Sequence, residues 1–162
     1  FDALDKRASS CRLDSDEFIF VIHNVFKPFM VFLRESSGFK LESEEDWLES
    51  ICPFCGYLPG MSKIVATRDN QRIMSCALCE HEWKFQRITC FICENNEQKQ
   101  QGYFEYTENP QYRAYYCDDC KTYIKAINVQ KTHDESDFDL QVDDILTTYL
   151  DASMLGKGYL RP

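Results

Sequence analysis

Residues 52–79 read CPFCGYLPGMSKIVATRDNQRIMSCALC, a segment that begins and ends with two cysteines separated by two residues. The same arrangement returns in residues 90–120, CFICENNEQKQQGYFEYTENPQYRAYYCDDC. Between its cysteine pairs, each segment has two stretches rich in Ile, Val, Tyr and Phe around a polar turn, which is typical of a β-hairpin. The sequence therefore predicts two tandem units, each consisting of a cysteine knuckle, a β-hairpin and a second knuckle.

Each C-x-x-C turn presents two thiolates to one metal, and a tetrahedral site needs four soft ligands. Because a hairpin brings its two knuckles together, we expect the sulfur atoms to form two quartets. The candidate ligands are Cys52, Cys55, Cys76 and Cys79 in the first site and Cys90, Cys93, Cys117 and Cys120 in the second. An interleaved arrangement, with the first and third knuckles paired, is the alternative. The expected cofactors are two metal ions, iron or zinc, since both suit tetrahedral sulfur.

A closed four-thiolate site is structural far more often than catalytic, and units of this size bury too little apolar surface to fold without a staple. We therefore predict a mainly structural role, with redox or iron-sensing behaviour as the alternative. His81 follows Cys79 by two residues, but four thiolates already complete the tetrahedron, so we expect it at the surface. Because the sequence has no Ser–His–Asp pattern, phosphate-binding glycine loop or H-E-x-x-H motif, we predict that the protein is not an enzyme.

The turn within a knuckle is tight, and Gly56 suits it because glycine accepts a positive φ. The equivalent positions hold Glu80, Glu94 and Lys121, so those three turns must form without glycine. Cys11, outside the knuckles, is expected to be a plain free thiol.

The protein is acidic, with 18 Lys and Arg against 27 Asp and Glu and a formal net charge of -9. Eight bound thiolates and two divalent ions would lower the net charge to about -13. Proteins that bind nucleic acid normally carry a basic surface that neutralises phosphates, so no nucleic-acid partner is expected. The acidic pairs at 118–119 and 143–144 are expected to be solvated surface.

No apolar run approaches the ~20 residues needed to cross a bilayer, so membrane insertion is not expected. Residues 1–10 lack the apolar core of a signal peptide. The C-x-x-C spacing of eight cysteines favours metal-bound thiolates over disulfides. Together these features predict a cytoplasmic protein.

Helical periodicity marks the chain before the first knuckle. Asp14 and Glu17 form a capping-box signature, and apolar residues follow at helical spacing through residues 18–33. Pro28 removes one backbone N–H, so a kink or split is expected there, and Gly38 should end the helix. Such a wide apolar face needs a partner, and we expect it to pack against further N-terminal helices or to form a homo-oligomer contact.

Further elements are expected on either side of the repeat. A short helix at 44–50, with Trp47 and Leu48 turned inward, should lead into the first knuckle. After the last knuckle we expect a strand at Thr122–Val129 and an exposed loop at 131–139. A C-terminal amphipathic helix should follow, carried by Val142, Ile145, Leu146, Tyr149, Leu150 and Met154.

The predicted fold class is therefore α+β, with two tandem zinc-ribbon-like four-cysteine modules flanked by N- and C-terminal α-helices. The expected divisions are a helical segment at 1–50, a first module at 51–89, a second module at 90–130, and an acidic loop with the C-terminal helix at 131–162.

Beyond the cysteines, the order of neighbouring residues resembles one family, the bacterial formate dehydrogenase accessory proteins of the FdhE type. The resemblance covers about residues 52–159. It lies in Cys52-Pro53-Phe54-Cys55-Gly56, Cys76-x-Leu78-Cys79-Glu80-x-Glu82-Trp83, Arg87-x-x-Cys90-x-x-Cys93-Glu94, Cys117-Asp118-Asp119-Cys120-x-Thr122-Tyr123-x-Lys125, and a tail with Asp143-Asp144-x-Leu146, Leu150-Asp151, Met154 and Gly158-Tyr159.

The resemblance implies a helical N-terminal region followed by two rubredoxin-like modules. It also implies an assembly factor that acts in the cytoplasm on the catalytic subunit of an exported, membrane-bound formate dehydrogenase, with iron at the cysteine quartets. The family has a longer N-terminal helical region than the residues before Cys52 provide, so a truncated copy or a fragment is expected. Two alternatives are a rubredoxin-like electron carrier and a nucleic-acid-binding zinc ribbon, for which Lys63, Arg68 and Arg72 offer a small basic face.

Overall fold

The computed structural model describes residues 2–41, 47–130 and 134–162. The chain divides into two compact units, Phe1–Lys40 and Leu41–Pro162. Among the described residues, no helix is both long and apolar enough to cross a membrane.

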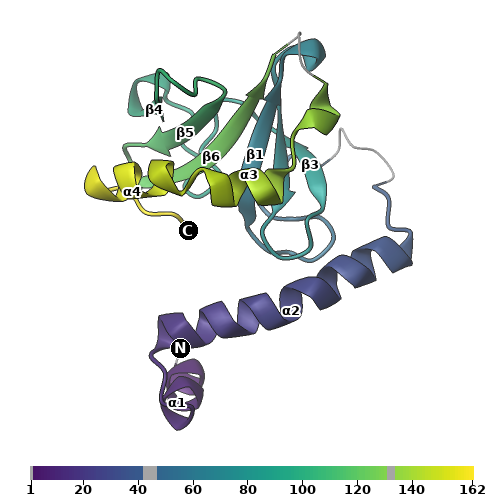
Figure 1. The fold of residues 1–162 in the computed structure, drawn as a ribbon, viewed down its shortest axis with the longest axis vertical. Coiled ribbons are helices and arrows are strands. Elements are labelled where there is room, and N and C mark those ends of the chain that lie inside the picture. The colour runs from purple at the N-terminus through teal and green to yellow at the C-terminus, as the bar shows by residue number, and fades with distance from the viewer. Residues whose placement is uncertain (1, 42–46, 131–133) are drawn as a thin grey trace. The chain divides into compact units, whose positions relative to one another are not determined.

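The first unit consists of α1 (Asp2–Ser10) and α2 (Ser15–Ser37), which contact each other (Figure 1). The capping box is confirmed, because Asp14 accepts the backbone N–H of Glu17 at 2.8 Å and Glu17 accepts that of Asp14 at 3.1 Å. Gly38 ends α2 in the left-handed conformation, as expected. The helix does not split at Pro28. Since no α2 residue is buried, water can satisfy the carbonyl that Pro28 leaves without its helical partner.

The helix expected at 44–50 is not found where the structure describes the chain. Residues 42–46 lie outside the described residues, and 47–50 are not helical. The indole N–H of Trp47 donates to the carbonyl of Ile51 at 3.0 Å. Leu48 is 45% exposed, so the prediction that it turns inward is wrong.

The second unit is built on one six-stranded sheet with the strand order β3-β2-β1-β6-β5-β4. The strands are β1 (Pro59–Val65), β2 (Gln71–Cys76), β3 (Glu82–Phe85), β4 (Gln101–Glu105), β5 (Tyr112–Cys117) and β6 (Thr122–Val129). Each cysteine repeat therefore contributes three consecutive strands, and both predicted hairpins and the strand at Thr122–Val129 are confirmed. Every neighbouring pair is antiparallel except β1 and β6, which are parallel and join the two halves at the centre.

Strand β3 was not expected. Its side chains alternate, with Trp83 and Phe85 buried and Glu82 exposed, and Trp83 pairs with Met74 of β2. The indole N–H of Trp83 donates to the carbonyl of Glu49 at 3.0 Å. β3 therefore pairs along β2 at the edge of the sheet, and Trp83 attaches the chain that leads into the first knuckle.

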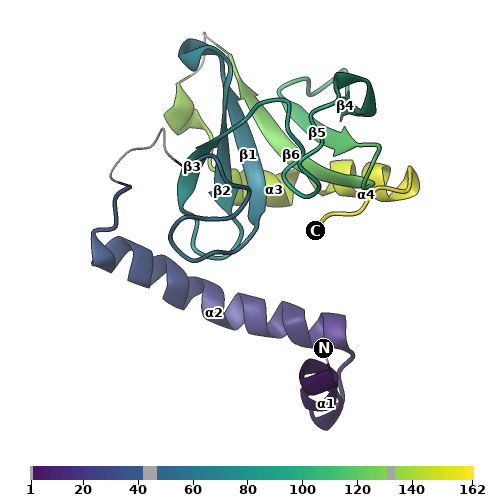
Figure 2. The same cartoon turned by 180° about the vertical axis from the view of Figure 1, so that it is seen from behind.

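Two helices, α3 (Leu140–Leu146) and α4 (Thr148–Gly156), lie on one face of the sheet (Figures 1 and 2). A single C-terminal helix was expected, but it breaks at Thr147, whose hydroxyl donates to the carbonyl of Asp143 at 2.6 Å. Leu150 and Met154 are fully buried, whereas the earlier apolar positions Val142, Ile145 and Leu146 are exposed. Within the described residues, 3-10 turns also occur at Ala66–Arg68, Gln98–Gln100 and Glu135–Asp137.

A buried ion network ties these helices to the sheet. Lys125 of β6 is 0% exposed, and its Nζ lies 2.8 Å from Asp144 and 2.6 Å from Asp151. Arg161 pairs with Asp144 at 2.7 Å. The neighbouring Asp143 is also buried and accepts a hydrogen bond from the hydroxyl of Tyr112 at 2.7 Å. The prediction that residues 143–144 are solvated surface is therefore wrong, because the sheet presents a lysine and a tyrosine to them.

The predicted α+β class, with helices at both ends and two four-cysteine clusters, is confirmed.

Candidate metal centres

The first quartet lies at one end of the β1–β2 hairpin. Its sulfur atoms all lie within 4.8 Å of one another, with Cys52 3.5 Å from Cys79 and Cys55 3.4 Å from Cys76. Cys76 is the last residue of β2 and pairs with Pro59 of β1, so the hairpin itself returns the second knuckle to the first.

The second quartet repeats this geometry on the β4–β5 hairpin. Cys90 lies 3.6 Å from Cys120, and Cys93 lies 3.7 Å from Cys117, with all four sulfur atoms within 4.8 Å. The sulfur atoms thus gather by module, and the interleaved arrangement does not form in the described structure.

These distances fit a metal ion. A tetrahedron with metal–sulfur bonds of about 2.3 Å places its sulfur atoms about 3.8 Å apart, close to the separations in both quartets. The same separations are far longer than the ~2.05 Å of a disulfide bond, and all nine cysteines are free thiols. Each quartet could therefore hold one metal ion.

All four knuckles use the same backbone turn. The residue after the second cysteine is left-handed in every case, with φ of 73° at Gly56, 60° at Glu80, 58° at Glu94 and 56° at Lys121. The expectation that three of the turns form without glycine is confirmed, although a side chain at such a φ is strained by about 1 kcal/mol. A metal held by the knuckle would offset that strain.

Backbone hydrogen bonds close these turns. The N–H of Cys52 donates to the carbonyl of Tyr57 at 2.8 Å, and the N–H of Gly56 donates back to the carbonyl of Cys52 at 2.9 Å. Cys90 and Asn95 repeat the first of these bonds at 2.9 Å. The turns are therefore fixed by the backbone, which directs the two side chains of each knuckle to the same side.

The first quartet is poorly suited to holding four thiolates without a cation. Hydrogen bonding with the Cys52 thiol lowers the pKa of Cys76 to about 2, whereas hydrogen bonding with the same thiol raises the pKa of Cys79. One thiolate is thus shared among protonated neighbours. Since a divalent ion would replace the remaining thiol protons, metal binding must release protons and weaken as the pH falls.

The second quartet is more open. Cys93 and Cys120 are half-buried, whereas three of the four cysteines in the first quartet are buried. The hydroxyl of Thr122 lies 2.9 Å from the sulfur of Cys120. Burial acts to raise the pKa of Cys120, but hydrogen bonds from Thr122, Cys93 and Cys90 together outweigh burial and lower the pKa to about 7.

Thr122 is a site residue that sequence reasoning missed, and its position offered a signal. It follows the last cysteine of its module by two residues, as His81 does in the first module. His81 belongs to neither quartet and is half-buried instead of lying at the surface. Its backbone carbonyl accepts the N–H of Cys76 at 2.9 Å, so the chain there supports the knuckle. Cys11 is an exposed free thiol, as expected, and His133 lies outside the described residues.

The fold and the two quartets together define a class of protein, one in which two four-cysteine hairpin modules share a single sheet and are flanked by helices. Comparison with known families is more specific. Residues 51–87 match the model of the FdhE central domain, and residues 88–162 match the model of the FdhE C-terminal domain.

Individual relatives agree. The FdhE homolog of Enterobacter sp. (strain 638) is 33% identical over 123 residues, and the FdhE protein of Escherichia coli O1:K1 is 34% identical over 127 residues; each match covers 75% of this chain and 38% of the relative. The crystal structure of the FdhE protein from Pseudomonas aeruginosa superposes with a TM-score of 0.61 at 31% identity, covering 70% of this chain and 39% of that chain.

Through residues 51–162, the chain belongs to the FdhE family. It spans about two fifths of the length of the curated relatives it matches.

Proposed function

We propose that this chain is an accessory protein for respiratory formate dehydrogenase, a maturation chaperone that binds the catalytic subunit in the cytoplasm. The observation that carries the proposal is the family membership of residues 51–162, the region that contains both cysteine quartets. Both quartets consist of cysteine alone, so the chemistry present is that of metal binding. An accessory role without enzymatic activity fits this composition.

We propose further that the eight quartet cysteines bind two metal ions, one in each module, with the module boundaries at 51–89 and 90–130. The sulfur separations support this assignment. The metal would fix the ends of β2 and β5, each of which terminates in a quartet cysteine. Visible absorption distinguishes iron from zinc, since thiolate–iron charge transfer absorbs in the visible range and zinc sites are colourless.

The metal assignment is tested by anaerobic purification followed by metal analysis and visible absorption. Two metals per chain are expected. Replacing Cys52 or Cys117 with Ser should remove one metal each, whereas Cys11→Ser, which changes an exposed thiol outside both quartets, should remove none. A metal content that stays at two in Cys52→Ser and in Cys117→Ser would refute the ligand assignment.

The accessory role is tested by co-purification. The tagged chain should retain the formate dehydrogenase catalytic subunit from cells grown under conditions that induce the enzyme, under anaerobic or aerobic handling. Cys11→Ser serves as the matched control for Cys52→Ser and Cys117→Ser. Failure to recover the catalytic subunit under both conditions, with the metals in place, would remove the support for this function.

A second candidate function, electron transfer, is favoured by one observation. Cys93 and Cys120 of the second quartet are only half-buried, and exposure of a metal site eases electron exchange with a partner. An iron-loaded protein whose colour bleaches reversibly on reduction would support this function. Absence of bleaching with an iron-loaded second quartet would exclude it.

Self-association through α2 is a separate proposal. Four apolar residues on one side of the helix are at least half exposed, and they are Val25, Phe26, Phe29 and Phe32. An apolar face of this extent is rare on a monomer, so we propose that two copies of this chain pair through α2. Sedimentation should show a dimer that Phe26→Glu dissociates, and a monomer at micromolar concentration would refute the proposal.

A further inference from the structure

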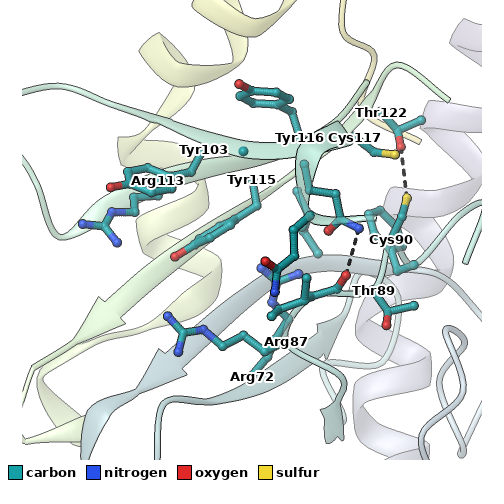
Figure 3. Close-up of a pocket in the computed structure, with 16 residues that line it drawn as sticks. Arg72, Arg87, Thr89, Cys90, Tyr103, Arg113, Tyr115, Tyr116, Cys117 and Thr122 are labelled. Atoms are coloured by element: carbon teal, nitrogen blue, oxygen red, sulfur yellow. Dashed lines mark hydrogen bonds between the residues drawn. The ribbon is translucent and has the colours of Figure 1, made fainter. Parts of the chain in front are cut away.

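A cavity of about 410 Å³ lies beside the second quartet (Figure 3). Ile124 of β6 lines this cavity. Its neighbours Tyr123 and Lys125 lie on the other face of the strand, where their side chains bond to Asp151 of α4. The cavity therefore opens on the sheet face opposite the two C-terminal helices. Its volume falls within the ~300–1,000 Å³ typical of small-molecule sites.

The lining of this cavity is basic and aromatic. Three arginines, Arg72, Arg87 and Arg113, contribute to it, and none of its described lining residues is Asp or Glu. Tyr103 and Tyr115 form much of its wall. Since the protein as a whole carries a net charge of -9, this gathering of guanidinium groups runs against the composition and marks the cavity as a distinct site.

Arg72 is the central observation. Only 4% of it is exposed, and its Nε has no hydrogen-bond partner among the described residues. Its guanidinium lies 4.6 Å from the centre of the Tyr115 ring, and no carboxylate of the described chain pairs with it. Burying a guanidinium without a counter-charge is strongly unfavourable, so such groups normally pair with an anion. Although burial lowers the pKa of Arg72 to about 10, the side chain remains a cation at pH 7.

The surrounding groups repeat this arrangement. Arg113 stacks on Tyr103 at 4.2 Å, and Tyr103 lies 5.7 Å from Tyr115, so the two rings lie between the guanidinium groups of Arg113 and Arg72 along the wall of the cavity (Figure 3). Arg113 is paired with Glu105, which leaves Arg72 and Arg87 as the cations without a carboxylate in this part of the described structure. An oxyanion between these two cations would accept charge-assisted hydrogen bonds from both.

We propose that this arginine–tyrosine cavity, defined by Arg72, Arg87, Tyr103 and Tyr115, binds a small organic oxyanion. The phosphate or carboxylate head lies on the two arginines, and an aromatic body packs against the two tyrosines. Because Cys90 and Cys117 also line the cavity, the ligand lies beside the second quartet. This site is independent of any contact with a formate dehydrogenase subunit, so its test uses the chain alone.

The test is calorimetric titration of the metal-loaded chain with phenyl phosphate, benzoate, inorganic phosphate and phenol. Phenyl phosphate and benzoate distinguish the two kinds of head, and both should bind more tightly than phenol. Phenyl phosphate should bind about tenfold more tightly than inorganic phosphate, since only the former packs on the rings.

Variants localise the binding. Arg87→Gln, at an exposed position that tolerates change, and Arg72→Gln should each weaken phenyl phosphate binding by about tenfold or more. Tyr103→Ala should weaken phenyl phosphate binding and leave inorganic phosphate binding unchanged. Arg68→Gln is the matched control, because Arg68 carries the same charge, is 53% exposed, and lies outside this cavity, where it pairs with Glu135.

Three results would overturn the proposal. The first is the absence of binding by both phenyl phosphate and benzoate at millimolar concentration. The second is an equal loss of affinity in Arg68→Gln and Arg87→Gln, which would indicate general electrostatic attraction. The third is salt-sensitive binding of a single-stranded RNA oligonucleotide that depends equally on Arg68 and Arg87, which would assign this surface to nucleic acid.

Discussion

Lys125→Met should lower the free energy of unfolding more than a substitution at the surface does. The Lys125 ammonium is 0% exposed and is bonded to Asp144 and Asp151, which are about three-quarters buried. Removing one partner of a buried ion pair costs about 3–5 kcal/mol because the other charge stays buried. Arg161 remains close to both carboxylates and compensates in part, so we expect a loss near the lower end, about 3 kcal/mol.

The assay is urea unfolding at pH 7, with wild type and variant loaded with the same metal. Lys121→Met is the matched control, since Lys121 pairs with Asp118 in a bridge whose side chains are 55% and 43% exposed. Such exposed pairs contribute about 0–1 kcal/mol. If Lys125→Met lost less than about 1 kcal/mol, or no more than Lys121→Met, the reasoning that this network joins sheet and helices would be refuted.

Three further predictions concern the same region and the second quartet. Burial acts to raise the pKa of Asp144, but Arg161 and Lys125 lower it below its ordinary value. The contribution of Asp144 to stability is therefore present above pH ~4 and is lost as the pH falls through the lower folded pKa. The stability advantage of wild type over Asp144→Asn should shrink between pH 5 and 3, and a constant difference would contradict this. Thr122→Val removes the hydroxyl beside Cys120 and should lower the reduction potential of an iron-loaded second site, measured by spectroelectrochemistry; an unchanged potential would show that the hydroxyl does not bond to the sulfur. Leu150→Ala, at a fully buried position, should lower the free energy of unfolding by about 2–5 kcal/mol, measured by thermal or urea unfolding. Ile145→Ala, at a position 73% exposed, should change it by no more than about 0.5 kcal/mol. Equal losses of unfolding free energy in the two variants would contradict the packing of α4.

The parts of the fold that were predicted correctly depend on short spacings. The two quartets and their hairpins follow from cysteine pairs and a return of the chain, and the capping box at Asp14 and Glu17 lies within a single helical turn. These features are decided by residues that are close in sequence, which a pattern can reveal.

The features that were missed depend on residues that the sequence keeps far apart. The parallel pairing of β1 with β6 places Met61 beside Lys125, and no local pattern indicates such a contact. The same holds for Asp143 and Asp144, whose burial depends on what β5 and β6 present to them. The break at Thr147 is different, since it results from a side chain that competes with the helix for one carbonyl.

The arginine–tyrosine cavity could not be predicted from the amino-acid composition. The overall acidity argued against a nucleic-acid partner, but a net charge sums over the whole surface and does not show where cations gather. Arg72, Arg87 and Arg113 come from separate stretches of the chain, and only the folded sheet places them around one space. Tyr103 and Tyr115 pair across β4 and β5, and both also form part of the wall of that cavity.

The parallel pairing at the centre of the sheet has a consequence for synthesis. β1 leaves the ribosome about 64 residues before its partner strand β6, since Met61 pairs with Lys125. At ~5–20 residues per second, that interval is roughly 3–13 s, during which β1 is an unpaired sheet edge of the kind that invites aggregation. The four cysteines of the first quartet have all been made by Cys79, well before β6 appears. We therefore expect metal capture in the first module to precede completion of the sheet and to protect the nascent chain while its central strand is still exposed.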